Sequence, residues 1–378
     1  MNNVITAGRM NAFMSCPRKH FWSHEVGLQS DKTYHALRFG SAWAKATEAR
    51  WKGATYEEAL AVSIPVGIDL DEYSCATLAA LLAGYYDHYG PIETFGEILP
   101  EAQFKFDLEL GFTSQGVMDG FGQLKDGRRA IIEGKTTSDS LDAGSDYWSR
   151  LMFNVQVEQY IDAAAQLGKP VDVVFYDVVR KPMIKPKEIF DLDSNGLKVV
   201  VDKKGQRVFA KKKVEVKKGK GKAAKVEKVE VDDESKPRQS ADKAKGWTIK
   251  SHVETPDEFC DRLYKDTQAR PDFYFARREI PVIEDRQEAL RRQRSAIIKL
   301  ILECRRNEDT EDEFGNEIFR DPEAWPRHVS SDTCDFCSFK SFCLQGVSVD
   351  INNPPSGFSL KEVFNPELHR DNNQLTSK

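Results

Sequence analysis

The residues best suited to chemistry are two carboxylates and a lysine in the middle of the chain. Asp119 lies in the string GVMDG, and Glu133 and Lys135 end the string RRAIIEGK. Residues two apart on a strand point to the same face, so Glu133 and Lys135 are predicted to share one side. Two carboxylates facing a lysine suit a divalent cation such as Mg²⁺ or Mn²⁺, with the lysine stabilising charge on a phosphate that water attacks.

An ordinary explanation of this triplet stays open, because exposed strands often alternate charges and a single E-x-K is weak evidence for a site. The apolar pair Ile131 and Ile132 comes directly before Glu133, which favours a site mounted on a sheet. Gln156 and Tyr160 stand four apart, on one face of a predicted helix. They either hold the lysine or a phosphate, or are ordinary helix residues with the tyrosine in the core.

Four cysteines at the two ends of the chain form a second candidate site. Cys16 lies near the start, and Cys334, Cys337 and Cys343 form a C-x2-C-x5-C pattern near the end. In a reducing compartment this spacing indicates metal or redox chemistry. Zn²⁺ accepts four thiolates, and so does a [4Fe-4S] cluster, which tolerates the longer gap and the distant ligand. The cluster is favoured and zinc is the alternative. Buried, unliganded thiols are expected at Cys75, Cys260 and Cys304.

An α/β core is predicted to position the central residues. Strand-like stretches cover 95–110, 114–123 and 128–137, with a turn at Asp126-Gly127. A helix over 146–168 and a buried strand over 171–179 follow. Further helices are predicted over 6–14, 36–52, 55–63 and 70–88, with a short one in FSLKEVF at 358–364.

One segment is strongly basic, although the whole chain carries a formal net charge of −5. Residues 203–245 contain 16 Lys and Arg against 7 Asp and Glu. The low complexity of this segment favours a solvated, poorly ordered insertion, and its alternation of valine with charge would also suit a solvent-facing hairpin. A tether that binds a nucleic-acid backbone through its lysines is the other interpretation.

The composition is ordinary for a chain of 378 residues, with 40% hydrophobic and 30% charged residues. No apolar run approaches the roughly 20 residues that span a bilayer, and the start has no signal-peptide pattern. We therefore expect a cytoplasmic protein without a membrane partner. No Walker-type GxxxxGK[ST] string is present, so any helicase that works with this chain is a separate polypeptide.

The order of GVMD, IIEGK and QxxxY, framed by the cysteines, resembles the PD-(D/E)XK nuclease superfamily. Within it, the chain looks like RecB-like and AddB-type exonucleases with an iron-sulfur staple, CRISPR adaptation nucleases and phage-borne relatives. MNAFMSCPRKHFW resembles the family's entry helix, and FYFARREIPV at 273–282 resembles a family strand. The resemblance covers residues 5–182 and 325–346.

This resemblance implies a mixed central sheet flanked by helices and a metal-dependent DNA exonuclease, placed in the host cytoplasm if phage-encoded. The DNA would have a free end or be single-stranded, and a separate helicase or a recombination or replication protein would be a partner. The expected regions are 1–92 (helical, with the first cluster cysteine), 93–200 (nuclease core), 201–250 (basic insertion), 251–346 (remaining nuclease part with the cysteine cluster) and 347–378 (tail).

The family's site residues carry over to matching positions. The metal ligands would be Asp119, Glu133 and the carbonyl of Gly134, Lys135 would be the catalytic lysine, and the Q-x-x-x-Y helix would supply Gln156 and Tyr160. The string FGSAWAKATE resembles the family's G-x-x-x-H-x-x-x-E helix, with Gly40 and Glu48 in place and Glu48 expected at the metal.

The family's histidine is missing, because Ala44 stands in its position. Either fewer protein groups hold the metal, or another histidine substitutes, or the chain is a weakened form. His35 lies nine residues away and out of register. Two other functions therefore stay open: a catalytically weakened DNA-binding or adaptor protein of the same fold, and a zinc-stapled interaction module with the basic segment as its docking arm.

Overall fold

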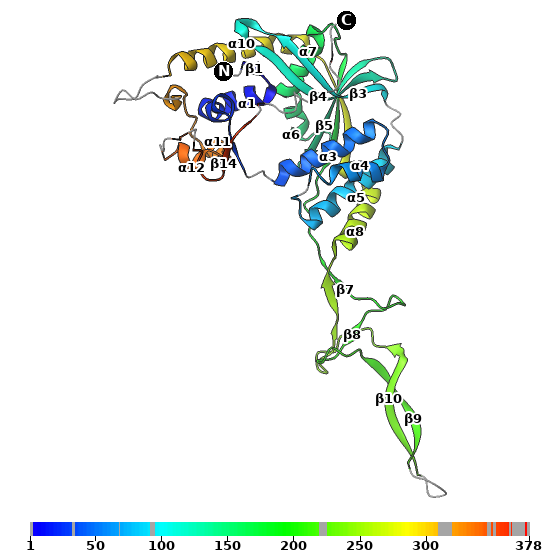
Figure 1. Ribbon diagram of the computed structural model, residues 1–378. Helices are drawn as coiled ribbons and strands as arrows, with labels where there is room; N and C mark the ends of the chain where they lie inside the picture. Colours follow the sequence, from blue (N-terminus) through cyan, green and yellow to red (C-terminus); the bar gives the residue numbers. More distant parts are fainter. Residues whose placement is uncertain are drawn as a thin grey trace. The chain divides into compact units, whose positions relative to one another are not determined.

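A six-stranded mixed sheet forms the centre of the protein, as the computed structural model shows (Figure 1). The hairpin of β4 (Thr113–Leu124) and β5 (Arg129–Thr137) is antiparallel, and β5 runs parallel to β6 (Val173–Arg180). The edges are β13 (Phe275–Pro281), antiparallel to β6, and the pair β1 (Val4–Ile5) and β3 (Phe95–Asp107), which both contact β4. The structure describes residues 3–31, 35–67, 69–90, 95–218, 225–308, 320–345, 349–350, 353–362, 364 and 375.

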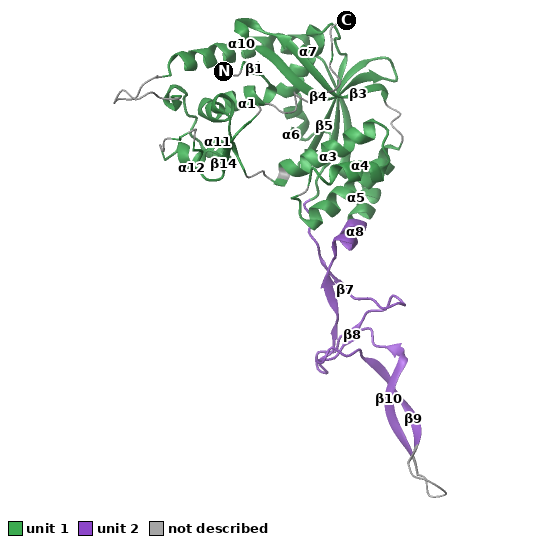
Figure 2. Cartoon of the chain, viewed as in Figure 1, with its two compact units in different colours: residues 1–182, 263–378 green, residues 183–262 purple. Residues whose placement is uncertain are grey.

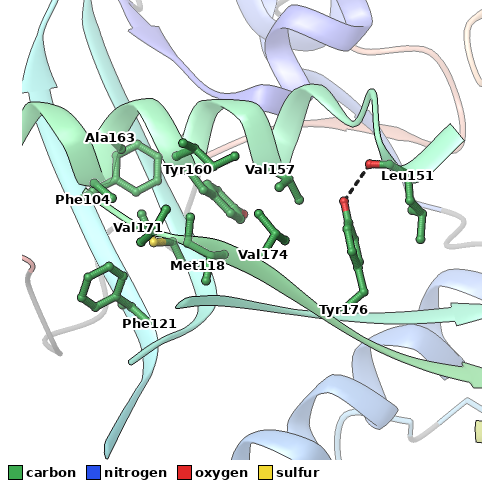
Figure 3. Close-up of a cluster of buried hydrophobic side chains, with 14 of the residues drawn as sticks. Phe104, Met118, Phe121, Leu151, Val157, Tyr160, Ala163, Val171, Val174 and Tyr176 are labelled. Atoms are coloured by element: carbon green, nitrogen blue, oxygen red, sulfur yellow. Dashed lines mark hydrogen bonds between the residues drawn. The ribbon is translucent and has the colours of Figure 1, made fainter. Parts of the chain in front are cut away.

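Helices lie on both faces of this sheet. On one face α7 (Val155–Gln166) covers a core of Phe104, Met118, Val174 and other apolar residues, and Tyr160 of α7 packs among them (Figure 3). On the other face Trp51, at the end of α3 (His35–Trp51), packs against a second apolar cluster. The helices α4 (Tyr56–Ser63) and α5 (Glu72–Tyr89) follow α3. The expected α/β fold with a mixed central sheet is confirmed.

The two ends of the chain meet in a separate apolar cluster. It joins α1 (Ala7–Ser15) and the turn that follows α2 (Pro17–His20) to α10 (Glu284–Arg306), to Trp325 and to α12 (Lys340–Cys343). Thr6 caps α1 by accepting a hydrogen bond from the Arg9 amide. The other elements here are β2 (Leu28–Ser30), the π-helical turn Phe21–Val26, the 3-10 turn Pro322–Ala324 and α11 (Ser331–Cys334).

Residues 183–262 form a second compact unit (Figure 2). Its longest feature is an antiparallel ribbon of β9 (Phe209–Lys218) and β10 (Lys225–Pro237), in which Val214 pairs with Val229. The segment in which valine alternates with charged residues thus forms a hairpin, as one interpretation of its sequence predicts. Shorter pairs are β7 (Glu188–Phe190) with β12 (Ser251–Val253) and β8 (Val200–Val201) with β11 (Thr248–Ile249). The unit extends beyond the 201–250 segment expected as an insertion. The helix α8 (Pro256–Ala269) follows, and α9 (Pro271–Tyr274) leads into β13.

Two predicted helices are wrong. The helix expected over 146–168 is divided into α6 (Asp146–Leu151) and α7, because the Asn154 side chain accepts hydrogen bonds from the amides of Gln156 and Val157 and starts a new helix. The segment FSL in 358–364 is the strand β14 (Phe358–Leu360), which pairs with β2. Across the described part of the chain, no helix combines the length and apolar character needed to cross a membrane.

Candidate functional site

The central carboxylates and the lysine line one large cavity of about 1080 Å³. Its walls come from α3, from the strands β3, β4 and β5, and from the first turn of α7. Of the residues expected at a site, the cavity lining includes Gly40, Glu48, Asp119, Glu133, Gly134, Lys135 and Gln156, together with Ala44. Tyr160 is not in this lining and contacts the site through Gln156.

Lys135 is held in place by two oxygen acceptors. Its Nζ forms an ion pair with Glu133 Oε1, as expected for residues two apart on a strand, and donates to Gln156 Oε1 at 3.0 Å. Gln156 Nε2 donates to the Tyr160 hydroxyl at 2.7 Å, and that hydroxyl donates to the Val117 carbonyl at 2.5 Å. A chain of hydrogen bonds therefore runs from β4 through α7 to the lysine and fixes the direction of the Gln156 amide.

Asp119 is joined to the next strand through a backbone group. Its Oδ2 accepts a hydrogen bond from the Gly134 amide at 2.9 Å. A Cβ at position 134 would lie 3.4 Å from the same oxygen, an ordinary van der Waals contact. Asp119 and the peptide after Glu133 thus lie side by side at the cavity wall.

Burial raises the pKa values of both carboxyls. Glu133 is fully buried, and its pKa is raised to about 8 by burial and by Asp119, against the opposing charge of Lys135. Burial also raises the pKa of Asp119, which Lys135 and the Gly134 amide partly offset. The pKa of Lys135 is lowered by burial but raised more by Glu133, so the balance lies above its ordinary value. Without a cation, ionisation of both carboxyls is therefore unfavourable.

Glu133→Gln is expected to stabilise the EDTA-treated protein at high pH. The folded chain keeps the Glu133 proton up to about pH 8, whereas the unfolded chain releases it near its ordinary value of about 4.3. The wild-type protein therefore loses stability as pH rises through this window, by a few kcal/mol at most at about 1.4 kcal/mol per pKa unit.

Thermal unfolding at pH 5 and pH 9 measures this effect. Wild type and Glu133→Gln should have similar Tm values at pH 5, and the variant should be higher at pH 9. Glu97→Gln, which changes an exposed carboxyl of β3, serves as the control. An equal difference between wild type and Glu133→Gln at both pH values contradicts the raised pKa.

The helix α3 contributes one carboxylate to the cavity and no imidazole. Glu48 is buried, and its two oxygens contact the ammonium groups of Lys45 and Lys52, the former at 2.6 Å. Ala44 also lines the cavity, and no histidine is found among the described residues of its lining. Within the described part of this cavity, no other histidine therefore takes the place of the missing one.

Several lining residues were not predicted from the sequence. Glu101 of β3 lies on the cavity wall, and Lys45, Lys52 and Lys181 add three ammonium groups to that of Lys135. Among the described residues, the lining thus has four lysines and four carboxylates. A signal for Glu101 exists in the sequence, because the turn at 109–111 between β3 and β4 sets which residues face each other. Counting outward from that turn places Glu101 opposite Asp119.

The four candidate cluster cysteines come together at a second, much smaller cavity. Cys16, Cys334, Cys337 and Cys343 all line it, and none of them is in a disulfide. Burial raises the pKa of Cys337 and of Cys343. Cations lie around the same cavity, namely Lys19, Arg327 and Lys340, which would offset the negative charge of four thiolates.

Arg18 fixes the head of the chain beside this cavity. Its amide donates to the Pro326 carbonyl at 3.0 Å, and its Nε donates to the Trp325 carbonyl at 2.9 Å. Because Arg18 lies two residues after Cys16, these bonds bring the first cysteine to the segment that carries the other three. The thiols at Cys75 and Cys260 are half-buried, and the thiol at Cys304 is buried.

Both sites offer the right donors for a metal. In the large cavity, Glu133 Oε2 is buried without a hydrogen-bond partner, which suits a cation as its missing neighbour. In the small cavity, four unpaired sulfurs suit a thiolate-bound metal or cluster. Within the described residues, however, no group of three or more His, Cys, Asp or Glu side chains is placed so that it could hold a metal ion. Ligand side chains at either site must therefore rotate to bind.

Comparisons with known proteins give one family match and two structural likenesses. A family model described as the PD-(D/E)XK nuclease superfamily matches residues 4–344. A solved structure of a candidate exonuclease from Eubacterium rectale shares 14% identity over 48% of this chain and 69% of its own, with a TM-score of 0.36. The structure of SSO0001 shares 10% identity over 92% of this chain and 89% of its own, with a TM-score of 0.32. No curated protein sequence matches the chain.

Proposed function

This chain belongs to the PD-(D/E)XK nuclease superfamily, and we propose that it is a metal-dependent DNA exonuclease of the RecB-like type. The observation that carries this proposal is the cavity in which Asp119, Glu133, Lys135 and Gln156 meet. The lysines of the lining, Lys45, Lys52 and Lys181 beside Lys135, can pair with the phosphates of a phosphodiester chain. We infer that digestion starts from a strand end, because the order of the sequence motifs resembles that of RecB-like exonucleases.

Lys135 is the residue that would stabilise the reacting phosphate. Its ammonium is fixed by Glu133 and Gln156 at the cavity wall, so little reorganisation is needed as negative charge develops on a phosphate oxygen. Gln156 sets the position of Lys135, and Tyr160 sets the orientation of Gln156. We therefore assign Lys135 to catalysis and Tyr160 to positioning.

Asp119, Glu133 and the Gly134 carbonyl would hold Mg²⁺ or Mn²⁺. The unpartnered Glu133 oxygen and the high pKa of Glu133 both support a cation there, because its charge would offset the two carboxylates. When bound, such a cation supplies Lewis-acid polarisation of the phosphate and acidifies water. Glu48 is a weaker candidate ligand, since lysines contact both of its oxygens.

The four cysteines would hold a [4Fe-4S] cluster that staples the two ends of the fold. Their shared cavity and the remote position of Cys16 support this assignment over zinc, because clusters accept irregular spacing. A bridge between Cys16 and Cys334 closes most of the chain into a loop, which restricts the unfolded state. The cluster would thus stabilise the fold, while the residues that catalyse the reaction would lie in the large cavity.

A weakened DNA-binding or adaptor protein is the second candidate function. The observation that favours it is Ala44, which places a methyl group on the cavity wall where the family has an imidazole. This candidate keeps the fold, the cysteine staple and the lysines of the cavity lining, and it predicts DNA binding without cleavage.

A nuclease assay separates these two functions. Protein purified without oxygen is incubated with end-labelled single-stranded and double-stranded DNA, with Mn²⁺, with Mg²⁺ or with EDTA. We expect progressive shortening from a strand end that requires the cation and stops with EDTA. A covalently closed single-stranded circle is the matched control and should remain intact. DNA binding without shortening in any cation would favour the adaptor function.

A further inference from the structure

Three carboxylates from three adjacent strands line the large cavity. Pro100 pairs with Gly120 and Ala102 pairs with Met118, which places Glu101 of β3 opposite Asp119 of β4. The pairing of β4 with β5 ends at Gly120 and Ile132, directly beside Asp119 and Glu133, and the Gly134 amide donates to Asp119 Oδ2 at 2.9 Å. All three acidic residues line the large cavity. The sheet therefore brings a third carboxylate to the two that the sequence motifs identify.

Glu101 has an unusual backbone conformation for a residue inside a strand. Its φ angle is 48°, in the left-handed region that favours glycine. Leu110 is the other non-glycine residue with positive φ within the described part of the chain, and it lies in the turn between β3 and β4. Strained conformations of this kind concentrate at functional sites, where the position of the side chain offsets the strain.

The lining of the cavity is short of ligands without Glu101. Ala44 has no donor atom, and both oxygens of Glu48 contact lysine ammonium groups. Glu133 lines the cavity and is fully buried, and its Oε2 has no hydrogen-bond partner. A cation at that oxygen would lie in the cavity whose lining also includes Asp119 and Glu101.

We propose that Glu101 is a third carboxylate ligand of the divalent cation that Asp119 and Glu133 bind. This inference rests on the cation site of the proposed function. Glu101 has three side-chain torsions, and rotation about them brings its carboxylate to the ion directly or through one water, which suits the several waters that Mg²⁺ retains. Glu101 thus supplies, from β3, the ligand that Ala44 does not supply from α3.

Manganese binding tests this role without any measurement of activity. The free Mn²⁺ signal in electron paramagnetic resonance is titrated against wild-type protein, Glu101→Gln and Glu97→Gln. Glu97 lies on the same strand but outside the cavity lining, so it is the matched control. We expect Glu101→Gln to weaken Mn²⁺ binding by about tenfold or more, as loss of a group at a metal site does, and Glu97→Gln to bind like wild type.

Glu101→Gly separates a ligand from a structural residue. Glycine accepts the φ of 48° without strain, so the EDTA-treated variant should unfold at a Tm no lower than wild type while binding Mn²⁺ as weakly as Glu101→Gln. Unchanged Mn²⁺ affinity in both Glu101 variants overturns the proposal, and so does a marked fall in Tm for Glu101→Gly. If wild-type protein binds no Mn²⁺ at all, the cation site of the proposed function fails with it.

Discussion

Lys135→Ala is expected to lower the rate of DNA cleavage by about a hundred- to a thousandfold, the usual effect of removing one fixed charge-stabilising donor. Glu133→Ala should abolish cleavage, because it removes both a cation ligand and the anion that holds Lys135. Neither change should prevent folding. With Lys135 gone, Glu133 stays protonated at neutral pH, since its pKa is already raised to about 8 with the lysine present.

Two measurements are needed for these variants. Cleavage of end-labelled DNA gives the rate, and fluorescence anisotropy with the same DNA gives the affinity, which we expect to change much less than the rate. Lys105→Ala removes an exposed lysine of β3 outside the cavity lining and is the control for loss of positive charge. Cleavage at the wild-type rate in both Lys135→Ala and Glu133→Ala would falsify the assignment of the active site.

Cys334→Ala is expected to remove the iron-sulfur cluster and destabilise the whole nuclease unit. By analogy with long-range cross-links, loss of the staple should cost about 2–5 kcal/mol. That cost corresponds to a fall in Tm on the order of 10 °C. DNA binding should be lost as well, because the N-terminal segment with Cys16 would separate from the segment that carries the other three cysteines. The cavity residues themselves are unchanged in this variant.

Iron and sulfide analysis, the visible spectrum and thermal unfolding of protein prepared without oxygen measure this effect. The matched control is Cys75→Ala, which removes a half-buried thiol from α5 far along the chain from the other cysteines. It should keep iron and nearly the wild-type Tm. A colourless wild-type protein that contains zinc and neither iron nor sulfide would replace the cluster with a zinc staple. A Cys334→Ala variant as stable as wild type would show that no staple exists.

Local patterns in the sequence were sufficient for most elements. The strands β4, β5 and β6 and the helices α1, α3, α4 and α5 lie close to their predicted positions, because apolar periodicity and turn residues act over a few residues. Prediction failed where a single polar contact or a distant partner decides the structure. Asn154 divides one expected helix in two, and Phe358–Leu360 is a strand because β2 is available to pair with it.

The sequence by itself determined the order of the motifs, and with them the family and the side of β5 on which Glu133 and Lys135 lie. A period of two along a strand is a local property, so residues two apart must share a face wherever that strand goes. The spacing of the three C-terminal cysteines is likewise visible in one short segment.

Only the tertiary structure decided which distant residues meet. Strand register places Glu101 opposite Asp119, and α7 brings Gln156 to Lys135 from a separate element. Packing of α2 against the segment around Trp325 brings Cys16 to the other cysteines, more than 300 residues away. Such contacts depend on how whole elements bury their apolar faces together, which no short stretch of sequence specifies alone. Burial in the folded chain also sets the pKa of Glu133.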